Sequence, residues 1–223
     1  MKNKKANLLS ILLFFIGLTG LQCQTVKDID GNIYKTIIIG KQTWMAENLK
    51  TTRLNDGGAI PQVTEVSVWE WLEKPGYCWY KNDESTYKNT YGALYNWFTV
   101  KTEKLCPAGW HVPSDSEWTA LLNLFGGVQT AGGKLKEKGT AHWKSPNTDA
   151  TNEAGFSGLP GGKRTPYFEE IGEYGNWWSS TAFNEGYLSK AWTFRMYFNF
   201  SNVQRTAGTG YKSYGYSVRC IKD

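Results

Sequence analysis

The side chains best suited to catalysis are few, and none stands in a complete catalytic motif. The two histidines, His111 and His142, lie far apart and outside any paired metal-ligand pattern. The segment 155–159 lacks the last glycine of a nucleophile elbow, because Leu159 takes its position. The segment 158–164 is one residue short of a phosphate-binding loop. We therefore expect loops at both segments and hydrogen-bonded structural roles for both histidines.

Two pairs of adjacent carboxylates, Asp83-Glu84 and Glu169-Glu170, are candidates for acid–base chemistry or cation binding. Such a pair could act on a glycosidic bond, and Asp83-Glu84 could hold a calcium ion. Carboxylates adjacent in sequence need not face one bond, so solvated loop charges are the favoured interpretation. Another calcium pattern starts at Asp28, but Ile33 and Ile39 replace the glycine and the closing glutamate of a calcium-binding hand. We expect a plain turn there.

The cysteines predict one disulfide. Cys23 ends a segment that we expect to be removed, which leaves Cys78, Cys106 and Cys220. Three cysteines in an oxidising compartment indicate one bridge and one thiol. We favour Cys106–Cys220, which would tie the centre of the chain to its last strand across 220 − 106 = 114 residues. Cys78 would then be a buried thiol, while the alternative pair Cys78–Cys106 stays open.

Aromatic residues are the most distinctive part of the composition. They make up 15% of the chain, with 11 Trp and 13 Tyr beside 24 Gly. So many rings with polar tips will not all fit in a core, and we expect several on loops or in a groove. Trp177 and Trp178, with Tyr174, are the candidate ligand platform. Because side chains alternate along a strand, one tryptophan should face the core and the other solvent.

The first 23 residues have the pattern of a secretory signal peptide. Three lysines precede the apolar run 8–18, which is too short to span a bilayer comfortably. Cys23 could be the lipid-modified first residue of a lipoprotein; cleavage after Cys23, leaving Gln24 first, fits the local pattern somewhat better. Residues 24–223 then form a single exported domain, extracellular, on the outer-membrane surface or in the periplasm, with no transmembrane helix.

The charge balance disfavours nucleic acid as a partner. Removing residues 1–23 takes away three lysines and no acidic residue, so the net charge of +5 falls to 5 − 3 = +2. The remaining lysines and arginines are spread along the chain rather than clustered. No nucleic-acid footprint and no polybasic membrane patch follows from this pattern. A lipid anchor would depend on Cys23.

The sequence predicts a helix after Pro113 more clearly than any other element. Ser114 followed by Glu117 forms a capping box, and Gly126-Gly127 supplies the stop. Between them, four apolar residues recur at helical spacing: Trp118, Leu121, Leu122 and Phe125. We expect this helix to pack on a sheet through that face.

The remaining elements are expected on both sides of this helix. Residues 34–39 and 42–45 read as a β-hairpin. Helices are expected at 65–74 and 91–100, with one helical turn at 134–138 among long loops. Alternating residues 192–200 predict a strand, with 177–181 and 214–221 as its neighbours. Helices in the middle and strands at both ends indicate an α+β fold with antiparallel sheets.

Several blocks of the sequence, in order, resemble the motifs of one family. They are 28–34, 39–49, 91–97, 106–114, 154–162, 175–181 and 217–220. On these blocks the chain resembles the Fibrobacter succinogenes major paralogous domain, common in exported proteins of Bacteroidetes and Fibrobacteres. The resemblance covers nearly all of residues 24–223, and the family has no general biochemical activity to transfer.

Two of these regions suggest a more distant likeness. Residues 110–118 and 217–220 are similar to the core of sulfatase-modifying-factor proteins. That resemblance implies a C-type-lectin-like fold, with antiparallel sheets, two or three short helices and long loops. Formylglycine-generating enzymes in that group use two nearby active-site cysteines. A Cys106–Cys220 bond would leave only Cys78, so the resemblance does not carry the activity with it.

These observations predict an exported, non-catalytic recognition module, with carbohydrate as the first ligand class to test. A structural protein that assembles with surface proteins is one alternative. A degenerate sulfatase-modifying-factor-like or sugar-acting enzyme is the other. We expect no resident cofactor, with calcium at Asp83-Glu84 as the minor alternative.

Overall fold

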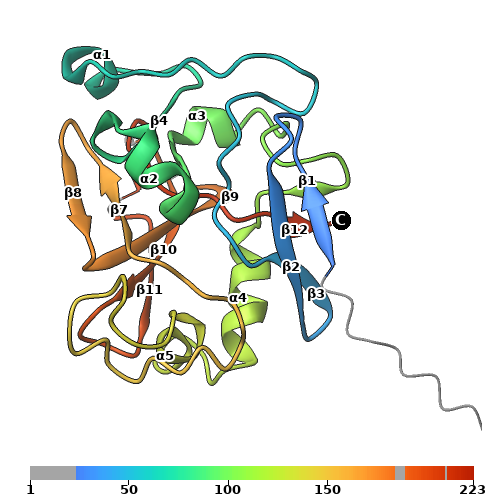
Figure 1. Cartoon of the computed structure of the whole chain (residues 1–223), viewed down its shortest axis with the longest axis vertical. Coiled ribbons are helices and arrows are strands. Elements are labelled where there is room, and N and C mark those ends of the chain that lie inside the picture. The colour runs from blue at the N-terminus through green and yellow to red at the C-terminus, as the bar shows by residue number, and fades with distance from the viewer. Residues whose placement is uncertain (1–23, 184–188, 209) are drawn as a thin grey trace, which may run out of the picture.

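The computed structural model of the protein describes residues 24–183, 189–208 and 210–223; the expected signal peptide, with Cys23, lies outside the described residues. Most strands belong to two five-stranded sheets (Figure 1). The first has the order β1-β2-β3-β12-β6: Thr25–Lys27, Ile33–Ile39, Gln42–Met45, Ile221–Lys222 and Trp110–His111. The second has the order β11-β10-β9-β7-β8: Val203–Thr206, Lys190–Tyr197, Tyr174–Phe183, Gly161–Arg164 and Phe168–Ile171. A ribbon pairs β4 (Tyr77–Cys78) with β5 (Leu94–Tyr95).

Five short α-helices lie in the described part of the chain, more than the two or three expected: α1 (Val66–Glu70), α2 (Glu84–Tyr91), α3 (Trp97–Val100), α4 (Asp115–Asn123) and α5 (Ala131–Leu135). A 3-10 turn, η1 (Tyr80–Asn82), precedes α2. Within the same residues, no helix is long and apolar enough to cross a membrane. The mixture of sheets and short helices confirms the α+β class. All strand pairs are antiparallel except β7–β9, which is parallel.

The hairpin and the capped helix predicted from sequence are both present. Strands β2 and β3 pair from Thr36–Met45 to Ile39–Gln42 around Gly40, which has a φ of +61°. In α4 the Ser114 N–H donates to Glu117 Oε2 at 2.7 Å, and the Glu117 N–H donates to Ser114 Oγ at 3.3 Å. Because both halves of the capping box form, α4 starts at a fixed place.

Helix α4 fills the space between the two large sheets (Figure 1). Its Trp118 ring stacks on Phe194 of β10, with centroids 4.9 Å apart, and also contacts Trp44 of β3 at 5.0 Å. Gln42 Nε2 donates to the Glu117 carbonyl at 3.2 Å, which fixes the hairpin to the helix. The apolar face predicted for this helix is therefore the joint between the sheets.

Strand β9 has a core on each side. One buried cluster contains Trp177 with Trp118 and Phe194. A second contains Trp178 with Tyr95 and Tyr216. Strand order places β9 between β10 and β7, so this strand is central as well as covered on both faces.

Several sequence predictions of elements are wrong in detail. The helix expected at 65–74 is limited to α1, the helical turn expected at 134–138 is α5, which begins and ends three residues earlier, and part of the loop expected at 158–164 is strand β7. Residues 91–100 do not form one helix, because Gly92 at φ +74° ends α2 and Asn96 caps the separate, shorter α3. Residues 214–221 do not form a strand beside β10. Instead, Gly215, Tyr216 and Ser217 make single bridges to Arg164, Tyr95 and Trp177, and only Ile221–Lys222 is a strand, in the first sheet. The segment threads between layers, where no single neighbour strand accompanies it. The alternating strand itself is confirmed, although it starts at Lys190, ends at Tyr197 and has a bulge near Trp192.

The disulfide prediction is confirmed. Cys106 and Cys220 are bonded, with Cα atoms 6.0 Å apart, and both are buried. The bond ties the segment before β6 to the segment before β12, two strands that also pair directly. Cys78 is a buried free thiol, as expected.

Candidate functional site

The predicted platform lies in the core rather than on the surface. Trp177 and Trp178 are both fully buried, so the expectation that one ring would face solvent is wrong. The indole N–H of Trp177 donates to Asn48 Oδ1 at 2.9 Å, and that of Trp178 donates to the Tyr95 carbonyl at 2.7 Å. Alternation along β9 does send the two rings to opposite faces. Both faces are covered, however, so neither ring is free to stack on a ligand.

Tyr174, the third predicted platform residue, is already engaged. It begins β9 and is half-buried. Its ring meets the Tyr197 ring edge-on, with centroids 5.0 Å apart, and the Arg195 guanidinium lies 5.2 Å from its centroid. The structure therefore does not bring Tyr174, Trp177 and Trp178 together as a site.

Among the described residues, the most exposed large apolar side chain is that of Trp71, just after α1. Its side chain is 78% exposed, whereas Trp69 two residues earlier is fully buried. Residues two apart on a helix point about 200° away from each other, so one ring of such a pair faces in and the other out. Trp71 thus presents a ring to solvent from a helix that is anchored by its neighbour.

The anchor under α1 is well defined. The Arg164 guanidinium of β7 lies 4.4 Å from the centre of the Trp69 ring. Its two terminal nitrogens donate to the carbonyls of Val63 and Thr64 at 2.6 and 2.7 Å. A fully buried arginine thereby provides hydrogen-bond donors for two backbone carbonyls just before α1 and packs against the Trp69 ring. The base of the helix is fixed although the helix is only five residues long.

Two hollows adjoin Trp71. The smaller, of about 180 Å³, has Phe98, Glu73 and Lys212 on its wall, and the larger, of about 350 Å³, has Thr165, Pro166 and Tyr214. Four residues line both and so form their common border: Glu70, Trp71, Tyr211 and Ser213. We call this border with its two hollows the Trp71 surface. It combines exposed rings with carboxylates and hydroxyls.

The charged groups of the Trp71 surface differ in how firmly they are held. The Lys212 ammonium lies 4.7 Å from the centre of the Trp97 ring, and partial burial together with repulsion from Lys101 lowers its pKa. The Lys190 ammonium lies 4.5 Å from the centre of the Tyr211 ring and steadies it. Glu70 and Glu73 are exposed to solvent. Exposed rings beside solvated carboxylates can accept both the apolar and the polar parts of a ligand.

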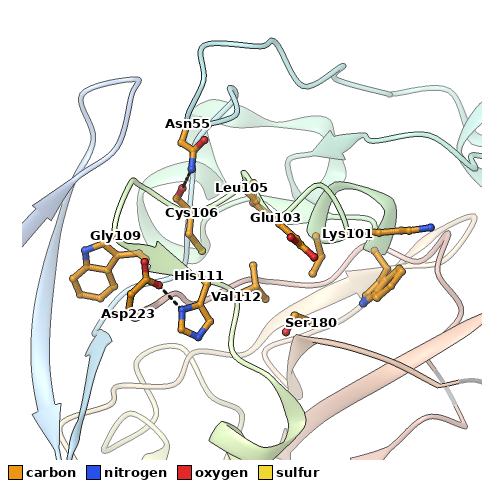
Figure 2. A pocket seen from close by; sticks show the side chains of 13 residues that line it. Asn55, Lys101, Glu103, Leu105, Cys106, Gly109, His111, Val112, Ser180 and Asp223 are labelled. Carbon is orange, nitrogen blue, oxygen red and sulfur yellow. Dashed lines mark hydrogen bonds and ion pairs between the residues drawn. The ribbon is translucent and has the colours of Figure 1, made fainter.

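A separate cleft of about 660 Å³ opens beside the disulfide (Figure 2). Val100, Leu105 and Val112 supply buried apolar wall, while Lys101 and Glu103 stand exposed at its edge. Figure 2 shows Asp223 against His111 at one end and Lys101 directed away from them. Asn55 donates to the Cys106 carbonyl at 3.0 Å across the upper wall. The cleft is larger than either hollow, but its aromatic rings, Trp97 and Trp110, are buried and half-buried.

His111 in this cleft links three parts of the fold. Its Nδ1 lies 2.6 Å from Asp223 Oδ1 after β12, and its Nε2 lies 2.9 Å from Glu117 Oε1 of α4. Partial burial lowers the pKa of His111, but the hydrogen bonds and charges of the two carboxylates outweigh it and leave the pKa raised. His111 is hydrogen-bonded, as predicted. His142 likewise contacts the Glu137 carboxylate at 2.9 Å.

Comparison with known proteins supplies the family. Residues 37–222 match the profile of the Fibrobacter succinogenes major domain. The chain belongs to the Fibrobacter succinogenes major domain family. The match includes both bonded cysteines, α4 and the Trp71 surface. No curated protein matches this family member, and no solved structure matches it. The C-type-lectin-like assignment therefore stays a prediction.

Sequence reasoning missed the exposed ring of this Fibrobacter succinogenes major domain. The signal was present in Trp69-Glu-Trp71, because a helix cannot bury both rings of such a pair against one neighbour. The pair at 177–178 gives the same signal, because its two rings also point in opposite directions. Tyr211 and Tyr214 gave no local signal, since only the fold brings them beside α1.

The other candidate residues of this family member have local partners. Asp83 caps α2 by accepting the Thr86 N–H at 3.0 Å, and Glu84 pairs with Lys88 at 2.7 Å. Within the described ranges, no group of three or more His, Cys, Asp or Glu residues is arranged to hold a metal ion. Burial raises the pKa of the Cys78 thiol to about 12, so this thiol is a poor nucleophile.

Proposed function

We propose that this protein is an exported, non-catalytic recognition module that binds carbohydrate at the Trp71 surface. The signal-peptide pattern of residues 1–23 and the Cys106–Cys220 disulfide support export, because such bonds persist in oxidising compartments. The C-type-lectin-like likeness and the lipid anchor at Cys23 are parts of the same proposal. Protein assembly at a cell surface is the alternative.

The exposure of Trp71 is the observation that carries this proposal. A ring that is 78% exposed contributes little to the core, yet its helix is held by a buried tryptophan and a buried arginine. Because its helix is anchored in this way, the exposed indole is available to contact a ligand, and tryptophan is enriched at binding interfaces.

The chemistry around Trp71 matches a sugar better than a purely apolar ligand. A pyranose has one face of C–H groups, which stacks on an aromatic ring, and a rim of hydroxyls, which needs hydrogen-bonding partners. Glu70 and Ser213 stand at the border of the two hollows beside the ring. A carboxylate accepts from hydroxyls, and a serine hydroxyl both donates and accepts.

A glycan array followed by calorimetry on the bound glycans tests the proposal. Trp71→Ala should weaken binding by about 1–3 kcal/mol, by analogy with the aromatic platforms that stack nucleic-acid bases. Phe200→Ala is the matched control, because Phe200 is 55% exposed and lines neither hollow. Phe200→Ala should bind like the parent protein.

Three results would redirect the proposal. Equal binding by Trp71→Ala and the parent would place the ligand elsewhere, with the His111 cleft as the next region to map. If no neutral or acidic glycan binds, the Trp71 surface would instead be assigned to a protein partner. Release of shortened products from any glycan would show an enzyme.

A further inference from the structure

The Trp71 surface has two hollows rather than one, and this constrains its ligand. On the basis of the proposed function, we infer that the surface is a groove with two subsites, which binds an internal stretch of an extended neutral glycan. The inference concerns the length and the charge of the ligand. It goes beyond the choice of carbohydrate as a class.

The smaller hollow is too small to enclose a ligand alone, and the larger is near the lower limit. Pockets that enclose a whole small-molecule ligand usually measure about 300–1,000 Å³. The smaller hollow, at about 180 Å³, falls below this range, and the larger, at about 350 Å³, lies at its lower end. They share Trp71 and Tyr211 at their border, so a ligand stacked there reaches both sides. A chain of sugars can fill both hollows at once, whereas a single sugar fills one.

The two hollows also differ in chemistry, so that they would hold different parts of the chain. The smaller contains a carboxylate and an ammonium, from Glu73 and Lys212. Among the described residues, the larger contains no charged side chain apart from the shared Glu70, and its wall includes Thr165, Pro166 and the Tyr214 ring. A linear glycan placed across them would have one preferred direction.

Charge decides between neutral and acidic glycans. Among the described residues that line this surface, two carboxylates, Glu70 and Glu73, stand against one ammonium, that of Lys212 at the smaller hollow. The Lys190 ammonium lines neither hollow, because it is buried behind the Tyr211 ring and donates to the Gly208 carbonyl at 3.0 Å. The Lys212 ammonium is already engaged over the Trp97 ring, and its pKa is lowered by burial and by Lys101. Uronic acids would meet net repulsion here, while neutral hydroxyls can donate to both carboxylates.

The test uses four oligosaccharide series from monosaccharide to hexasaccharide: glucose, mannose, xylose and galacturonic acid. Isothermal calorimetry of the full chain should show affinity that rises with length and then levels off for a neutral series. Galacturonic acid should bind more weakly at every length. Glu73→Gln in the smaller hollow and Tyr214→Phe in the larger should each weaken hexasaccharide binding about three- to tenfold. Both substitutions keep the shape of the side chain, and Trp71→Ala should weaken binding about 5- to 150-fold at all lengths.

The outcomes separate this inference from the proposed function. A neutral monosaccharide that binds as tightly as its hexasaccharide overturns the two-subsite groove but leaves carbohydrate recognition intact. Preference for galacturonic acid overturns the assignment of a neutral ligand. A change in only one of the two conservative variants reduces the site to a single hollow and also overturns the inference. Failure of all four series to bind, or equal binding by Trp71→Ala, instead contradicts the proposed function.

Discussion

The chain holds two close pairs of tryptophans that meet opposite fates. Trp177 and Trp178 are adjacent on strand β9 and are both fully buried. Trp69 and Trp71 are separated by one residue at α1, and one is fully buried while the other is 78% exposed. Both pairs project their rings in opposite directions. The difference lies in what covers each side.

Whether the two rings of a pair are buried depends on the elements packed around the pair, not on the pair itself. Strand β9 is central in its sheet, with α4 over one face and the segments carrying Tyr95 and Tyr216 over the other. Helix α1 lies at the periphery of the molecule, away from α4 (Figure 1), and its Trp69 side packs on Cys78 and Leu94 of the β4–β5 ribbon. The pair on β9 is therefore wholly part of the core, whereas the pair at α1 leaves one ring on the surface.

The largest test of this contrast is Trp177→Ala. Removing a fully buried ring that contacts Trp118 and Phe156 should lower the free energy of unfolding by about 3–5 kcal/mol. It also leaves Asn48 Oδ1 without one of its donors. Denaturant unfolding measures the loss. A cost below about 1 kcal/mol would mean that the ring is not core and would restore the original platform.

Helix α4 and the hairpin could be predicted because their signals are local. A capping box and a two-residue turn are complete within a few residues, and both formed as expected. The environment of Trp178 could not be predicted in this way. Its hydrogen-bond partner is Tyr95, and its ring packs on Tyr216, so its burial depends on segments far away in the sequence.

The candidate site shows the same limit. The expectation of an exposed aromatic ring was sound, but the residues first chosen for it were wrong. Trp71, Tyr211 and Tyr214 come from distant segments that meet only in the fold. The charges beside them follow no sequence motif. Composition indicated the chemistry, and tertiary packing decided its position.

Arg164→Met sharpens the contrast at the second pair. This arginine holds the buried member, Trp69, and its loss leaves the Val63 carbonyl without its donor and the Thr64 carbonyl with only Asn82 Nδ2 at 3.3 Å. Loss of two hydrogen bonds from a fully buried charged group should cost about 2–4 kcal/mol. Hydrogen exchange at the Trp69 amide, which bonds to the Glu65 carbonyl, should rise more than exchange in β9. Arg53→Met, which breaks an exposed ion pair, is the control and should cost at most about 1 kcal/mol.

Ser114→Ala tests the helix that covers Trp177. Loss of the side-chain acceptor for the Glu117 N–H should cost about 1 kcal/mol. Ser116→Ala is the matched control, because the Ser116 hydroxyl contacts only that of Ser114. It should stay within about 0.5 kcal/mol of the parent protein. Equal losses in thermal or denaturant melts would contradict the assigned cap.

The same helix end should respond weakly to pH through His111. Its folded-state pKa is raised by Asp223 and Glu117 against the effect of burial, so its contribution is fully present below the unfolded value of about 6.5 and is lost as pH rises through the folded value. The pKa of Glu117 is lowered by Ser114 and His111 against burial, so its contribution is lost as pH falls through its folded value. His111→Gln should therefore destabilise the protein more at about pH 6 than at about pH 9. A difference in unfolding midpoint that does not change with pH would contradict the ion pairs.

The smallest expected effect on stability is also the one that separates the two pairs most clearly. Trp71→Ala removes as many atoms as Trp177→Ala, but from a ring that is 78% exposed. Little apolar area returns to water, so the free energy of unfolding should change by no more than about 0.5 kcal/mol. Trp69→Ala, two residues away, should cost about 3–5 kcal/mol because that ring is fully buried under Arg164. Similar losses for the two variants of α1 would show that Trp71 supports the fold, and the reason to assign it a ligand would disappear. A large loss for Trp69→Ala alone would show that the helix is anchored by Trp69, while the exposed Trp71 ring is not needed for stability and is available to a ligand.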